Sequence, residues 1–85
     1  MRVLGKDRSE EAYRLGLRIG ETEIVALIPE ALLSAEHGTD AKVPHQAAYE
    51  WIEDRADALV TAIRTLQSGA RPRAPYDQIT LEAVR

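Results

Sequence analysis

The sequence predicts an α+β fold in which a small antiparallel sheet packs against one short helix and one long helix. Residues 13–19 alternate apolar and polar side chains, which is the period of a half-buried strand. Residues 45–69 repeat apolar side chains every three or four positions, which is the period of an amphipathic helix. Residues 79–83 alternate again, so the expected order is β-β-α-α-β. At 85 residues, the chain is expected to form a single domain, residues 1–85.

The first third of the chain predicts a hairpin. Residues 1–12 have a mixed pattern and are interpreted as a loosely ordered loop, although Val3 and Leu4 could add a short edge strand. The first strand is followed by residues 20–22, whose composition suits a tight turn. Residues 24–28 are apolar at every position, as in a strand that lies mid-sheet or is covered on both faces. We therefore expect an antiparallel pair of strands here.

Two prolines and two glycines delimit the predicted helices. Pro29 ends the second strand because it has no N–H to donate, and the short helix that follows ends at Gly38 in the left-handed position after the helix. Pro44 starts the long helix, which ends at Gly69 for the same reason. The apolar stripe of the long helix is expected in the core and consists of Tyr49, Ile52, Ala56, Leu59, Ile63 and Leu66.

A second row of side chains lies beside that stripe. Trp51 is in line with Ala58 and Ala62, and Arg55 stands one turn after Trp51. Either the short helix covers this row, or the row contacts a second protomer with Trp51 as its anchor. The second apolar face of residues 24–28 also favours a contact surface. The candidate interface residues are therefore Trp51, Arg55, Ala58, Ala62, Ile24 and Ala26.

Charge is unevenly distributed along the chain. The net charge is −3, with +2 over residues 1–20, −7 over residues 21–62 and +2 over residues 63–85. The acidic middle argues against broad nucleic-acid binding, which needs clustered basic side chains. A smaller basic patch remains as an alternative and would consist of Arg14, Arg18, Arg71 and Arg73. The Arg-Pro-Arg loop at residues 71–73 lacks interleaved aromatic residues, the groups that stack on bases.

The sequence offers little catalytic or metal-binding chemistry. It contains no cysteine, which excludes disulfides and thiolate sites. His37, Asp40 and His45 carry metal-ligand atoms, but their spacing matches no compact zinc motif, and His37 is expected to bond the last carbonyls of the short helix. Phosphate-binding glycine loops and nucleophile elbows are also missing. We therefore predict no catalytic residue, no metal, no cofactor and no enzyme activity.

The hydropathy pattern predicts a cytoplasmic protein without membrane contact. No apolar run approaches the roughly 20 residues that span a bilayer. The N-terminal residues lack the continuous apolar segment of a secretory signal.

Several short motifs occur in a recognisable order. Glu30-Ala31-Leu32 lies in the short helix, Trp51, Arg55 and Ala62 lie in the long helix, and Gly69 and Ile79-Thr80 follow. Over roughly residues 13–85, this order resembles the bacterial family known as domain of unknown function 1488. The resemblance implies a small bacterial α+β protein, and it implies no activity and no functional residues.

The function predicted from these observations is that of a non-catalytic interaction or accessory module. It would act by protein–protein contact, as a homodimer or with an unidentified protein partner. The alternative is a minor nucleic-acid-associated regulator that uses the arginine patch.

Overall fold

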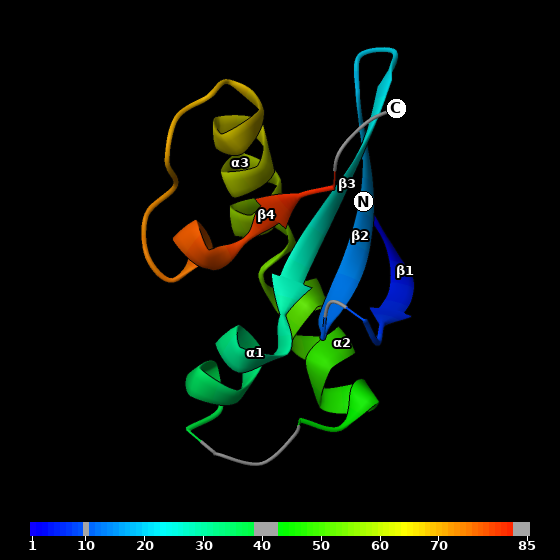
Figure 1. The fold of residues 1–85 in the computed structure, drawn as a ribbon, viewed down its shortest axis with the longest axis vertical. Helices are drawn as coiled ribbons and strands as arrows, with labels where there is room; N and C mark the ends of the chain where they lie inside the picture. Colours follow the sequence, from blue (N-terminus) through cyan, green and yellow to red (C-terminus); the bar gives the residue numbers. More distant parts are fainter. Residues whose placement is uncertain (10, 39–42, 83–85) are drawn as a thin grey trace.

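The computed structural model describes residues 1–9, 11–38 and 43–82, and its fold is the predicted α+β class (Figure 1). The elements in chain order are β1 (Arg2–Asp7), β2 (Ala12–Ile19), β3 (Thr22–Pro29), α1 (Glu30–Glu36), α2 (His45–Asp54), α3 (Ala56–Gln67), a short 3-10 helix (Tyr76–Gln78) and β4 (Thr80–Leu81).

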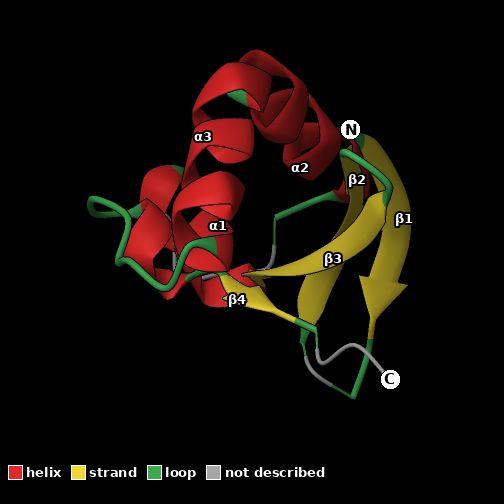
Figure 2. Ribbon diagram, turned by 90° about the horizontal axis from the view of Figure 1, so that it is seen from above, coloured by secondary structure: helices red, strands yellow, loops and turns green. Residues whose placement is uncertain are grey.

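The four strands form one antiparallel sheet in the order β1-β2-β3-β4, and the helices lie on one side of it (Figure 2). Ile19 pairs with Thr22, so Gly20 and Glu21 form a two-residue hairpin turn. Gly20 has φ +62°, which a residue without a Cβ adopts at little cost. The predicted hairpin is therefore confirmed.

The loop predicted over residues 1–12 is wrong for residues 2–7, which form β1, and the alternative of an edge strand that includes Val3 and Leu4 is confirmed. Val3 pairs with Leu15, and the register then shifts between Val3 and Gly5, which leaves Leu4 as an extra residue. Gly5 has φ +113°, in a region that side chains avoid. Such a bulge interrupts the period-two alternation that would identify a strand in the sequence. β1 is stabilised by its backbone pairing with the outer edge of β2, which a pattern within residues 1–12 does not reveal.

The core lies between the sheet and the helices. On β3, Ile24, Ala26 and Ile28 face the helices and are 4%, 0% and 0% exposed. Ile24 and Ala26 were candidate interface residues, and that assignment is wrong. A strand that is apolar on both faces does not reveal in its sequence which face the helices will cover.

The single helix predicted over residues 45–69 is also wrong, because the chain breaks at Arg55 between α2 and α3. Arg55 has φ −113° and ψ 23°, and its N–H lies 3.2 Å from the Trp51 carbonyl and 3.3 Å from the Ile52 carbonyl. The two helices point in different directions (Figure 1). Neither proline nor glycine marks the break, so the local sequence contains none of the usual signals.

The break changes which side chains are buried. Ile52, Leu59 and Ile63 of the predicted stripe belong to the core, whereas Tyr49 is 42% exposed. Trp51, which is outside the predicted stripe, is buried, whereas Tyr49 is not. With the break, each helix turns its own apolar side inward: α2 buries Ala48, Trp51 and Ile52, and α3 buries Leu59, Ala62 and Ile63.

The predicted helix ends are confirmed. Gly38 and Gly69 have φ +69° and +89°, the left-handed conformation that ends many helices. The ring Nδ1 of His37 lies 3.0 Å from the Leu33 carbonyl, as expected for a histidine after the short helix. The C-terminal strand begins one residue later than predicted, at Thr80, and Leu81 pairs with Ala26; Ala83 lies outside the described residues.

Truncation of Ile63 tests this arrangement of the core. Ile63 is fully buried, so we expect Ile63→Ala to lower the free energy of unfolding by about 2–5 kcal/mol, measured by urea denaturation. Val60→Ala is a matched control, because Val60 is half-buried and outside the core cluster, and it should cost less. A loss below about 1 kcal/mol for Ile63→Ala would contradict the placement of α3.

Candidate functional site

The side of the sheet opposite the helices has a small apolar centre, which we call the open face. Val25 and Leu27 of β3 are half-buried and outside the core cluster, and Leu4 is 39% exposed. Leu4 lies over Gly16, where a Cβ would come within 3.3 Å of its Cδ1. The missing side chain at Gly16 therefore lets Leu4 pack flat against β2.

Charged side chains of both signs surround this apolar centre. The Arg14 guanidinium donates two hydrogen bonds to the Glu82 carboxylate, at 3.0 and 3.2 Å. Arg18 is paired in register with Glu23. A hollow of about 320 Å³ lies beside Arg18 and Glu23. Its lining includes Arg2, Leu4, Gly16, Arg18, Glu23 and Val25. The open face therefore combines apolar contact area with neighbouring positive and negative charges.

The predicted arginine patch is divided between two surfaces. Arg14 and Arg18 alternate with the core-facing residues of β2 and so belong to the open face. Arg71 and Arg73 border a groove beside α3, which packs on the other side of the sheet (Figure 2). Arg71 also forms an ion pair with Asp77, at 3.2 Å.

Aromatic side chains do not accompany the arginines of the open face. The four aromatic residues of the chain lie in the core, on the helices or in the C-terminal connector, and they are Tyr13, Tyr49, Trp51 and Tyr76. Proteins that bind single-stranded nucleic acid stack bases on aromatic rings, and the described part of the open face provides none.

In the row formed by Trp51, Arg55, Ala58 and Ala62, which we call the Trp51 row, the tryptophan is covered from within the chain, whereas Ala58 is half-buried. Trp51 is 5% exposed and Ala62 is 4% exposed. The Trp51 ring contacts the Tyr76 ring, with 6.4 Å between centroids, and the Arg55 guanidinium carbon lies 4.9 Å from the Trp51 ring centroid, in the range of a cation–π contact. Trp51 is thus a core residue and is not an exposed anchor. The contribution of Tyr76 was missed because it is distant in sequence from α2.

Trp51 also carries an unsatisfied polar atom. Its Nε1 is buried and has no hydrogen-bond partner among the described residues. A buried N–H without an acceptor lowers stability. The position of the Trp51 side chain therefore depends on packing, including its contacts with Tyr76 and Arg55, and not on a hydrogen bond.

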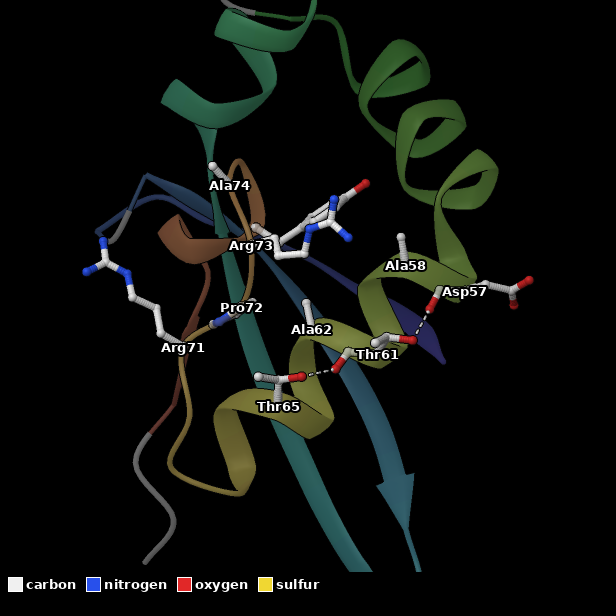
Figure 3. A pocket seen from close by; sticks show the side chains of 10 residues that line it. Asp57, Ala58, Thr61, Ala62, Thr65, Arg71, Pro72, Arg73 and Ala74 are labelled. Atoms are coloured by element: carbon white, nitrogen blue, oxygen red, sulfur yellow. Dashed lines mark hydrogen bonds between the residues drawn. The ribbon is translucent and has the colours of Figure 1, made fainter.

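A groove separates α3 from the connector formed by residues 71–76 (Figure 3). It encloses about 460 Å³. Its α3 side is formed by Ala58, Thr61, Ala62 and Thr65, and its connector side includes Pro72, Arg73 and Tyr76. Arg73 extends toward α3, whereas Arg71 and Asp57 point away from the groove (Figure 3).

The two histidines make separate local contacts. His45 Nδ1 lies 2.9 Å from the Tyr13 hydroxyl, and His37 bonds the end of α1. The third residue considered from the sequence, Asp40, lies outside the described residues. Within residues 1–9, 11–38 and 43–82, no group of three or more histidine, aspartate or glutamate side chains could hold a metal ion.

Tyr13 has a perturbed acidity. Burial raises the pKa of its phenol above the ordinary value of 10.0, and Glu30 also raises this pKa whereas Lys6 lowers it. The pKa of Tyr13 is higher in the folded protein than in the unfolded chain, so the protonated phenol stabilises the fold. This contribution to stability is fully present below about pH 10 and is lost as the pH rises through the folded-state pKa.

The alkaline stability of the Tyr13→Phe variant tests this effect. The variant cannot ionise at this position, so between about pH 9 and pH 12 its free energy of unfolding should fall less steeply than that of the parent. Tyr76→Phe serves as the control, because Tyr76 packs against Trp51 and is not among the groups that shift the pKa of Tyr13. The free energy of unfolding is measured by urea denaturation at each pH. If it falls equally steeply with pH for the parent and for Tyr13→Phe, the raised pKa of Tyr13 is refuted.

No described helix combines the length and the hydropathy required to cross a bilayer. Comparison with known proteins identified no matching family model, no matching curated protein and no matching solved structure. The resemblance to the domain of unknown function 1488 family therefore stays a prediction.

Proposed function

We propose that the protein acts by protein–protein contact without catalysis, and that a second copy of the chain covers the open face. The observation that carries this proposal is the position of Val25 and Leu27. Both lie outside the core, on the side of the sheet that the helices leave free (Figure 2). Together with Leu4 they form an apolar area of the kind that marks contact sites.

The charges of the open face favour a second copy as the partner. Arg2, Arg14 and Arg18 stand there with Glu23 and Glu82, three positive and two negative side chains, so the face has both signs and a small net positive charge. A two-fold dimer brings the same surface of each copy together. A face of one sign would repel itself, whereas neighbouring opposite charges such as Arg18 and Glu23 can pair across the axis.

Two other surfaces that the sequence suggested are less suitable. Trp51, the expected anchor of the Trp51 row, is covered by Tyr76 and by Arg55 of the same row. The free edge of β1 contains the shift at Leu4 and the unusual backbone of Gly5, and bulges of this kind hinder the addition of another strand. The open face is the remaining candidate among the surfaces considered from the sequence.

Nucleic-acid association remains the alternative function, with less support. Arg14 is already paired with Glu82 and Arg71 with Asp77. Phosphate binding in this protein would therefore depend on few unpaired arginines, divided between two sides of the sheet.

Sedimentation of Val25→Glu tests the proposed dimer. We expect the parent to form a dimer at micromolar concentration and the variant to be a folded monomer. Burying a carboxylate at the centre of the contact costs about 3 kcal/mol or more even with Arg18 nearby, equivalent to a roughly 100-fold weaker dimer. Thr61→Glu, on the exposed surface of α3, is the matched control and should remain dimeric.

Circular dichroism of both variants verifies that they are folded. A parent protein that stays at 9.4 kDa at every concentration would contradict self-association. A Val25→Glu variant that dimerises like the parent would place the contact elsewhere.

A further inference from the structure

We propose that the groove between α3 and residues 71–76 binds a small amphipathic carboxylate, whose apolar body lies on the groove floor and whose carboxylate pairs with Arg73. This groove is on the helix side of the sheet, away from the open face (Figures 2 and 3). The inference is therefore independent of the proposed dimer.

The size and lining of the groove suit a small organic molecule. Its volume of about 460 Å³ lies within the usual range for ligand pockets, about 300–1,000 Å³. Ala58, Ala62, Pro72 and Tyr76 contribute apolar surface. The short side chains of α3 keep the groove open, and the Tyr76 ring offers a flat surface for an aromatic or aliphatic group.

Arg73 determines the charge of the ligand. It is exposed, and no carboxylate in the described part of the chain is paired with it. The other charged residues of the lining are directed elsewhere: Arg71 pairs with Asp77, and Arg71 and Asp57 point away from the groove (Figure 3). A single unpaired guanidinium beside apolar walls complements one carboxylate, which it can bind through two hydrogen bonds.

The threonine hydroxyls of the α3 wall are already engaged with the helix backbone. Thr61 donates its hydroxyl hydrogen to the Asp57 carbonyl at 3.0 Å, and Thr65 donates to the Thr61 carbonyl at 2.9 Å (Figure 3). With these hydrogens engaged, the oxygens present only acceptor lone pairs to the groove. The α3 wall therefore offers an anion no unengaged hydroxyl donor, and Arg73 is the group that can hold the carboxylate of the ligand.

Trp51 provides the readout. It is the single tryptophan of the chain, and its ring contacts Tyr76, which lines the groove. The experiment titrates the full chain with 4-phenylbutyrate and, separately, with its uncharged amide, and follows Trp51 fluorescence. Amide chemical shifts of 15N-labelled protein locate the site in the same samples.

We expect the carboxylate to bind more tightly than the amide, with shifts concentrated on α3 and the connector. Arg73→Gln should weaken 4-phenylbutyrate by about tenfold or more and leave the amide nearly unchanged. Arg71→Gln is the matched control, because Arg71 points away from the groove (Figure 3), and it should bind like the parent. Ala58→Leu should fill the groove and weaken both ligands.

Three results would overturn the proposal. They are the absence of any carboxylate binding up to about 10 mM, equal affinity of the parent and Arg73→Gln for the carboxylate, and shifts that fall on the open face instead of the groove. Since Arg73 is exposed, its replacement should leave the fold intact, and the shift map of the free variant verifies this.

Discussion

Strand β3 is apolar on both of its faces, and the rest of the structure depends on what covers each face. Ile24, Ala26 and Ile28 face the helices and form the centre of the core. Val25 and Leu27 then necessarily face the other way, because side chains alternate along a strand. One strand therefore provides both the main element of the core and the apolar part of the open face.

The C-terminal segment completes the side of the core that α2 and α3 leave open. Ile79 is buried just before β4, and Tyr76 packs against Trp51. The backbone N–H of Glu82 then bonds the Val25 carbonyl at 2.7 Å, and the Glu82 side chain holds Arg14. The last described residues thus connect the helical layer to the middle of the sheet, which explains why Trp51, which looked available for a partner, is covered.

The two candidate surfaces differ in the physical basis of recognition. The open face is broad, apolar at its centre and nearly balanced in charge, which suits a surface like itself. The groove beside α3 is concave and has one unpaired positive charge at Arg73, which suits a small anion with an apolar body. Because the sheet separates them, one could be occupied without blocking the other.

The sequence by itself determined the α+β class, the β2–β3 hairpin and the helix ends, because these depend on local periodicity and on the backbone preferences of proline and glycine. Only the tertiary structure decided the rest. β1 exists because the edge of β2 was available to pair with it, and the bulge at Leu4 hides that strand from a periodicity argument. The break at Arg55 and the burial of Trp51 follow from packing against the sheet and Tyr76, contacts between residues far apart in the chain, which no local pattern records.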